Sequence, residues 1–204
     1  MSKQQREPTS LFTTADGDVF YMGDVFYVDD DGMAHSLGAS EKLKQLNVER
    51  PIGFKAQDER AVISVFTDYS CGYCVKFHER VLPLMLKAGI SVNYFAFPRG
   101  GMVTLEANQL AKAWCSDDPQ TAISQLKKGV VIEGEASSPM RNCNDDVLQQ
   151  YISGRLFNIT GTPTILTQDG YMIEGLPAIS ASQAVETEEQ LEEWLKMMRV
   201  VEVE

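Results

Sequence analysis

The sequence predicts an α/β protein in which one sheet is covered by helices on both faces. Two runs of apolar, β-forming residues, 61–66 and 90–97, are separated by a segment with helical spacing. This order is typical of a β-α-β unit. A helical block follows at 101–157, and the chain then continues with a β-hairpin and an amphipathic helix. The combination favours a sheet between helical layers over an all-helical or all-β fold.

The first part of the chain, residues 1–38, is expected to form a short and partial β region. Residues 19–22 and 25–28 are rich in β-formers and flank the Gly23-Asp24 step, so we expect them to pair as a hairpin. The Asp-rich segment 29–32 ends in Gly and marks a second turn. A unit of this size is too small for a core of its own and must pack on other protein.

Residues 39–57 are predicted to be a linker helix followed by a turn. Leu43 and Leu46 alternate with charged residues, and Ser40 is a suitable N-cap. The step Glu49-Arg50-Pro51 is expected to end the helix, because proline cannot continue it.

The remaining residues, 58–204, are expected to form the main domain. The run 61–66 is almost continuously apolar, as in a strand buried on both faces. A helix is expected at 74–88, with a kink at Pro83 and an end at Gly89. Because crossover connections are right-handed and short, the strands before and after this helix should pair in parallel.

Three helices are expected in the block at 101–157, and two strands and a helix after it. The three helices are expected at 103–114, 119–127 and 145–157, and Asn144 or Asp145 is the expected cap of the last one. After the block, strands at 165–167 and 171–173 are expected to form a hairpin, and an acidic amphipathic helix follows at 187–198.

Composition and charge exclude several classes of partner. The chain has 204 residues, of which 44% are hydrophobic and 23% charged, as is ordinary for a globular protein. Its net charge of −11 repels nucleic acid and anionic lipid, so neither is an expected partner. No stretch approaches the ~20 apolar residues of a membrane helix. The N-terminus lacks the apolar core of a secretory leader, which fits either a cytosolic protein or a mature chain whose leader has been removed.

The chemistry of the chain centres on Cys71-Gly72-Tyr73-Cys74, which lies between a predicted buried strand and a predicted helix. Free N–H groups and the helix dipole at a helix start favour a thiolate, so Cys71 is expected to be an exposed nucleophile. Cys74, one turn further on, is the expected resolving thiol, which releases a mixed disulfide. Gly72 allows a partner backbone to approach, and Gly72 and Tyr73 tune the Cys71 thiol. The pattern therefore predicts thiol–disulfide exchange.

Two other interpretations of the cysteines remain open. Cys71 and Cys74 could form a permanent short disulfide. Alternatively, Cys71, Cys74 and His78 share one helical face and could bind zinc with a distant fourth ligand, Cys115 or Cys143. The even count of four cysteines fits two pairs as well as one zinc site, although no second CxxC is present. For His78 itself a packing or surface role is favoured over that of a catalytic base.

Several segments, in order along residues 39–200, resemble the periplasmic disulfide isomerases of the DsbC/DsbG family. The Gly-Tyr dipeptide between the cysteines is nearer to DsbC than to DsbG. The segments that carry the resemblance are 66–79 around the CxxC, 93–99, Ala113-Trp114-Cys115, Cys143 and Gly161-Thr162-Pro163-Thr164.

The resemblance implies a thioredoxin fold with an inserted helical subdomain at about 101–157. It implies a cis peptide bond between Thr162 and Pro163, opposite the CxxC, whose exposed backbone would pair with an extended substrate. Without the resemblance, Pro163 would be interpreted as an ordinary proline at the start of a strand. Cys115 and Cys143 match the family's structural disulfide, with a second redox pair as the alternative. No metal and no other cofactor is implied.

The resemblance also implies function and partners. The clients would be unfolded or misoxidised proteins, and a membrane thiol reductase of the DsbD type would regenerate the dithiol in the periplasm. Family members dimerise through an N-terminal domain, and here only part of such a domain is recognisable, so a homodimer is a possible but open expectation. The alternatives are a net thiol oxidase of the DsbA kind and a chaperone-type module that binds unfolded chains.

Overall fold

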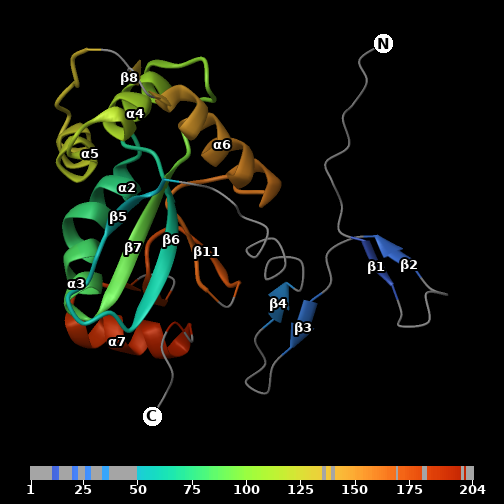
Figure 1. The fold of residues 1–204 in the computed structure, drawn as a ribbon. Helices are drawn as coiled ribbons and strands as arrows, with labels where there is room; N and C mark the ends of the chain where they lie inside the picture. The colour runs from blue at the N-terminus through green and yellow to red at the C-terminus, as the bar shows by residue number, and fades with distance from the viewer. Residues whose placement is uncertain are drawn as a thin grey trace.

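The computed structural model describes residues 11–13, 20–22, 26–28, 34–36, 50–134, 137–138, 141–168, 170–180, 183–198 and 200. Its centre is a five-stranded sheet with the strand order β11-β10-β6-β7-β5 (Figure 1). The strands are β5 (Ile52–Phe54), β6 (Ala61–Thr67), β7 (Ile90–Ala96), β10 (Thr164–Leu166) and β11 (Met172–Glu174). β6 and β7 pair in parallel, as predicted, and the other neighbours are antiparallel.

The short edge strand β5 differs from the prediction, which placed its residues in the turn after the linker helix. Ile52 to Phe54 pair antiparallel with Val92 to Tyr94 of β7. A strand of three residues with a central glycine has almost no pattern of its own, so the free edge of β7 determines its conformation. The hairpin of β10 and β11 is confirmed.

The helix after β6 is interrupted before its proline. It begins at Gly72, two positions ahead of the predicted start, as α2 (Gly72–Lys76), widens into the π-helical η1 (Phe77–Val81) and continues as α3 (Leu82–Lys87). Pro83 has no N–H to donate to the preceding turn, so the predicted kink takes the form of a π turn. Gly89 ends the helix with a φ of 79°.

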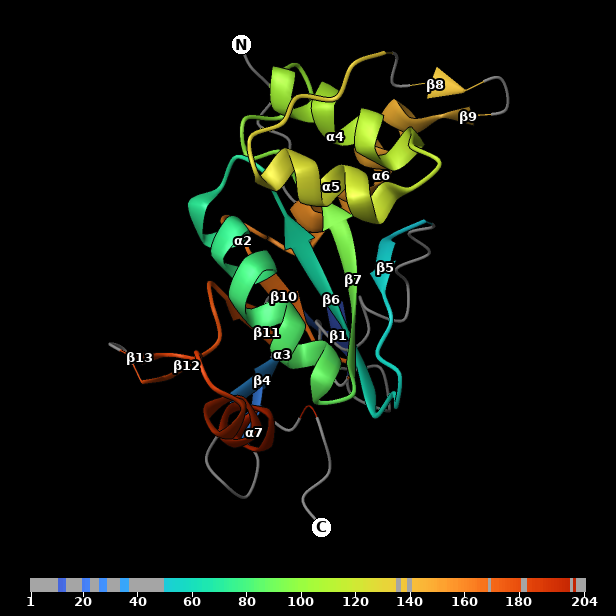
Figure 2. The same cartoon turned by 90° about the vertical axis from the view of Figure 1, so that its left-hand side faces the viewer.

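Three helices lie together beyond the carboxyl ends of β6 and β7 (Figure 2). They are α4 (Leu105–Cys115), α5 (Pro119–Lys127) and α6 (Cys143–Leu156). The predicted cap of α6 is wrong: the helix begins earlier, and the side chain of Asn142 accepts the backbone N–H of Asn144. Asn142 is itself a good capping residue and directly precedes Cys143, whose disulfide places the first turn of α6 beside α4.

The predicted C-terminal helix is present as α7 (Glu188–Met197), with Thr187 and Gln190 forming a capping box. It lies at the end of the sheet opposite α4–α6 (Figure 2). Four further strands of two or three residues were not predicted from the sequence. β8 (Ser137–Ser138) and β9 (Arg141–Asn142) lie beside α4 and α6, and β12 (Ala178–Ser180) and β13 (Gln183–Ala184) precede α7 (Figure 2).

The side chains of the two central strands alternate between two apolar clusters. Val65 and Tyr94 belong to the larger cluster, which also takes in residues of α3, α4, α5 and α7. Phe66 and Phe95 face the other way and stack on each other beside Phe157, which follows α6. The sheet therefore has helical cover on both faces, as predicted.

The N-terminal strands pair differently from the prediction. β1 (Leu11–Thr13) pairs with β2 (Phe20–Met22), and β3 (Phe26–Val28) pairs with β4 (Ala34–Ser36). The expected hairpin across Gly23-Asp24 is therefore wrong. The sequence between each true pair contains Asp-Gly, a stronger hairpin signal than Gly-Asp.

The predicted linker helix at 40–48 lies outside the described residues. Among the helices that are described, none is long and apolar enough to cross a membrane.

Candidate active site

The CxxC motif lies where β6 ends and α2 begins. Cys71 is the N-cap of α2, and its backbone N–H donates to the carbonyl oxygen of Asp68 across a tight turn. Cys74 lies within the first turn of the helix. Both cysteines are free thiols. Only 3% of Cys71 is exposed, so the prediction of an exposed nucleophile is wrong, because the segment around Thr162 lies against its sulfur. Cys74 is 1% exposed.

The segment around Thr162 and Pro163, which is distant in the sequence, lies beside the CxxC motif. The thiol of Cys71 donates to the carbonyl oxygen of Thr162 at 3.2 Å. The peptide bond from Thr162 to Pro163 is cis and leads directly into β10. Because β10 pairs with β6, the sheet itself holds this segment beside Cys71.

The two residues between the cysteines face outwards. Apart from its chain neighbours and the backbone of its own helix, no heavy atom lies within 4 Å of the position that a Cβ on Gly72 would occupy. Tyr73 is 61% exposed, and the ammonium group of Lys76 lies 5.6 Å from the centre of its ring. The approach to the motif from this side is therefore open and partly aromatic.

The pKa values of the two thiols are shifted in opposite directions from the ordinary thiol value. Burial by itself raises the pKa of Cys71, but four groups outweigh it and bring that pKa below the ordinary thiol value: the Thr162 side chain, the backbone N–H groups of Cys74 and Tyr73, and the Arg99 guanidinium. Burial raises the pKa of Cys74, and the nearby charge of Lys127 offsets this only in part. Cys71 is thus the thiol that ionises first.

A buried carboxylate, Asp68, organises the turn before Cys71. One of its oxygens accepts the backbone N–H and the hydroxyl of Ser70, at 2.9 and 2.8 Å. The other accepts the backbone N–H and Nε of Arg99, at 3.0 and 3.2 Å. Arg99 lies in the loop after β7, so this carboxylate joins the carboxyl ends of both central strands and holds a positive charge near Cys71.

A buried lysine, Lys127, lies on the inner side of the motif. It is the last residue of α5, and its Nζ donates to the hydroxyl of Thr67 at 2.8 Å and to the carbonyl oxygen of Cys74 at 3.5 Å. Its side chain is only 4% exposed, which is rare for a lysine.

His78 is packed between elements. Its Nδ1 lies 3.2 Å from the Tyr94 hydroxyl and its Nε2 3.0 Å from the Ser124 hydroxyl. Burial and the charges of Lys127 and Lys128 lower the pKa of His78 to about 4, so the ring is neutral at neutral pH. In the ranges that the structure describes, no group of three or more His, Cys, Asp or Glu side chains is arranged to hold a metal ion.

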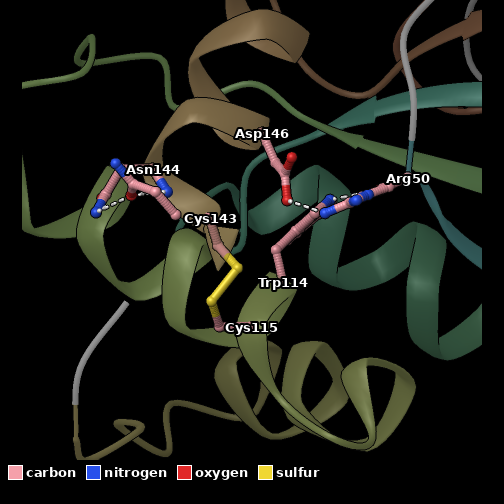
Figure 3. The surroundings of a disulfide bond; sticks show 7 residues. Arg50, Trp114, Cys115, Cys143, Asn144 and Asp146 are labelled. Carbon is pink, nitrogen blue, oxygen red and sulfur yellow. Dashed lines mark hydrogen bonds and ion pairs between the residues drawn. A yellow bond between two sulfur atoms is a disulfide. The ribbon is translucent and has the colours of Figure 1, made fainter. Parts of the chain in front are cut away.

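Cys115 and Cys143 are joined in a disulfide between the end of α4 and the start of α6 (Figure 3). Close by, the indole N–H of Trp114 donates to the carbonyl oxygen of Arg50, whose guanidinium lies 3.7 Å from the carboxylate of Asp146. The disulfide therefore joins α4 to α6, and the contacts of Arg50 attach the helical insert to the segment that leads into β5.

Asp68, Arg99 and Lys127 are site residues that the sequence did not single out. The first two lie within segments used for the family resemblance, but no role was assigned to them. The sequence does contain a signal for Lys127. It lies four positions after Ile123 and one after Leu126, on the apolar face of α5, where a charged residue is unexpected.

The fold and the paired free thiols at a helix start define a thioredoxin-like thiol–disulfide exchange protein. The family model of the thioredoxin-like domain matches residues 51–196. The chain is 32% identical over 169 residues to the thiol:disulfide interchange protein DsbC of Salmonella typhimurium, covering 81% of this chain and 67% of that protein. For DsbC of Dickeya dadantii the identity is 34% over 167 residues, with the same two coverages.

The solved structures support the fold. A disulfide interchange protein from Neisseria gonorrhoeae superposes with a TM-score of 0.56 at 19% identity, covering 74% of this chain and 97% of that one. The catalytic domain of Proteus mirabilis ScsC gives a TM-score of 0.52 at 21% identity, covering 78% and 97%. The chain belongs to the DsbC family of thiol:disulfide interchange proteins, and its predicted α/β, thioredoxin-like fold class is confirmed.

Proposed function

We propose that this enzyme isomerises or reduces wrong disulfides in client proteins, with Cys71 as the attacking thiol. The observation that carries the proposal is the placement of two free thiols at the start of α2, with Cys71 as the N-cap and Cys74 within the first turn. In keeping with this placement, the pKa of Cys71 is lowered and that of Cys74 is raised. A thiolate attacks disulfides whereas a thiol does not, so the pair has one ready nucleophile and one held in reserve.

The reaction begins when the Cys71 thiolate attacks a client disulfide. A bond forms between Cys71 Sγ and one client sulfur, and the other client sulfur leaves as a thiolate. That thiolate can then attack another client disulfide and, in the end, displace Cys71, which is isomerisation. Alternatively, Cys74 attacks Cys71 Sγ and releases a reduced client, which is reduction.

Thr162 and Pro163 are proposed to hold the client. Their position beside Cys71 and at the entrance to β10 supports this role, because an extended client segment could pair with the backbone at this point. The open space at Gly72 and the exposed ring of Tyr73 give such a segment room and apolar contact. Cys115 and Cys143 are proposed to be structural, since their bond lies within the helical insert.

The test is recovery of activity by a scrambled multi-disulfide protein in a glutathione buffer. The wild-type chain is expected to speed recovery, Cys71→Ala to abolish the gain, and Cys115→Ala with Cys143→Ala to retain it. Recovery no faster than in buffer alone, with wild type and Cys71→Ala equal, would refute the proposal.

Net oxidation of client thiols is a second candidate, favoured by the lowered pKa of Cys71. A low thiol pKa stabilises the reduced form of the enzyme and makes its disulfide more oxidising. Oxidation of a reduced peptide by the Cys71–Cys74 disulfide, without any recovery of the scrambled protein, would favour this candidate over isomerisation.

The remaining parts of the proposal follow from family membership. The expected compartment is the periplasm, and the expected electron donor is a membrane thiol reductase of the DsbD type. The proposed organisation is a dimerisation-type β region at 1–38, a linker helix within 39–57 and the catalytic domain at 58–204 with its insert at about 101–157. A homodimer would be detected by light scattering of the chain.

A further inference from the structure

Lys127 is a positive charge enclosed by the core. It ends α5, on the face that also buries Ala122, Ile123 and Leu126, and only 4% of its surface is exposed. Its Nζ lies 5.3 Å from the centre of the Tyr94 ring, so the ammonium group is surrounded by an aromatic face, the Thr67 hydroxyl and the Cys74 carbonyl.

Within the described part of the chain, no carboxylate forms an ion pair or hydrogen bond with Lys127. The charge of Asp68 favours the ammonium form of Lys127, but its oxygens are hydrogen-bonded to Ser70 and Arg99. A buried ammonium group without a directly paired anion is costly, because its lost hydration is replaced only in part. Its hydrogen bonds to a hydroxyl and a carbonyl compensate for only part of that loss.

Both thiols become anions during the reaction, and Cys74 is the one whose backbone accepts a hydrogen bond from Lys127 and whose charge acts on it most strongly. We propose that Lys127 is a positioning residue whose charge stabilises the Cys74 thiolate in the resolving step, so that the helical insert governs how fast the enzyme releases a reduced client. The inference rests on the proposed function, because it concerns the second half of the same reaction.

The step involves two sulfur bonds. Cys74 first loses its proton to water, and the thiolate then attacks Sγ of Cys71 in the mixed disulfide. The Cys74–Cys71 bond forms, the bond from Cys71 to the client sulfur breaks, and the client thiolate leaves with the electron pair and takes a proton from water. The client is reduced and the enzyme dithiol is oxidised.

The acidities of the neighbouring groups agree with this role. Burial lowers the pKa of Lys127 to about 8, while the charges of Cys74, Asp68 and Cys71 act to raise it, so the ammonium form prevails at neutral pH. Conversely, Lys127 is the strongest influence that lowers the pKa of Cys74 against burial.

Other charged or titratable groups surround this pair. The charge of Arg99 acts on both cysteines. The Tyr94 ring faces the ammonium group of Lys127, and the neutral ring of His78, next to the Tyr94 hydroxyl, is influenced by the charges of Lys127 and Lys128. Among the described residues, none of these groups has a hydrogen bond to Lys127, whereas the backbone carbonyl oxygen of Cys74 accepts one.

The test measures the resolving step alone, with dithiobis(nitrobenzoate) as the probe. Attack by Cys71 releases one coloured thiolate, and the attack by Cys74 that follows releases a second, so stopped-flow absorbance separates the two steps. In Lys127→Met the second release is expected to slow and its pH midpoint to rise, while the first release changes much less. Each unit of pKa removes about nine tenths of the thiolate at neutral pH. The greater nucleophilicity of the more basic thiolate returns part of that, which leaves roughly a threefold slowing per unit.

Lys128→Met is the matched control, because Lys128 is the adjacent residue and is exposed. It is expected to leave the second release unchanged. Lys127→Arg keeps the charge and is expected to bring the pH midpoint back toward that of wild type. A second release in Lys127→Met with the wild-type rate and pH midpoint would overturn the inference, and so would equal slowing in Lys128→Met.

A second variant covers the case in which Lys127→Met does not fold. Lys127→Gln removes the charge but keeps a side-chain N–H group that can donate to the Thr67 hydroxyl and the Cys74 carbonyl. It is expected to slow the second release and to raise its pH midpoint, as in Lys127→Met. A folded Lys127→Gln with the wild-type rate and pH midpoint would overturn the inference. A normal two-step release without recovery of a scrambled client would instead refute the proposed function and leave Lys127 in its role.

Discussion

Removing the Cys115–Cys143 disulfide should destabilise the protein by an amount that follows from the length of the loop it closes. The two cysteines are 28 positions apart in the sequence. In the chain-entropy model a loop of this length corresponds to about 3.6 kcal/mol at 25 °C. Cys143 is fully buried, so removing its sulfur leaves a small cavity and adds a smaller loss of packing. We expect Cys115→Ala with Cys143→Ala to lower the free energy of unfolding by ~3–4 kcal/mol.

The assay is urea unfolding followed by circular dichroism. Both the reference and the variant should carry Cys71→Ser and Cys74→Ser, which prevent thiol exchange during the measurement. The variant should also show a steeper dependence on urea, because its denatured chain is no longer cross-linked and exposes more surface. A loss of less than ~1 kcal/mol with an unchanged slope would refute the loop-closure reasoning.

Three further predictions concern ionisation and packing. In a Cys74→Ser background, alkylation of Cys71 by iodoacetamide should show a pH midpoint below the ordinary thiol value of 9.0, and Arg99→Met should move it upwards; a midpoint at or above 9.0 would contradict the assigned electrostatics. The pKa of His78, about 4 against an ordinary 6.5, means that the unfolded chain binds the proton first. Stability should therefore fall as the pH drops from 6.5 towards 4, and the fall in urea midpoint should be smaller in His78→Gln. Gly154→Ala places a methyl group 2.5 Å from a ring carbon of Phe97 and should lower the free energy of unfolding by roughly 1–3 kcal/mol. An unchanged melting temperature in thermal unfolding would contradict this prediction.

The parts of the fold that follow from regular patterns were predictable from the sequence. The apolar runs of β6 and β7 and the helical spacing after Cys74 predicted the parallel pair and its crossover helix, because burial on a sheet requires these periods. The CxxC was recognisable for a related reason: its position between a strand and a helix is itself part of the chemistry. In each case neighbouring residues carry the whole pattern.

The elements that were missed depend on contacts between distant residues. β5 exists because the edge of β7 is free, and the cap of α6 moved to Asn142 beside a disulfide that joins two helices. The Gly23-Asp24 hairpin was wrong for a local reason, since Gly-Asp is a weaker hairpin signal than the Asp-Gly steps at 16–17 and 31–32, across which the strands do pair. Lys127 was visible only as a charge on an apolar helix face, and its meaning depends on Cys74, 53 positions away.

The central claim is that Cys71 is the thiol that attacks client disulfides and Cys74 the one that releases the client. Its most direct test is to mix the Cys74→Ser variant with a scrambled multi-disulfide protein, quench with acid, and map the trapped mixed disulfide by mass spectrometry of the peptides. The account predicts a stable adduct between Cys71 and a client cysteine, and no adduct in a Cys71→Ser variant. An adduct on Cys115 or Cys143, or equal trapping in the Cys71→Ser variant, would contradict it.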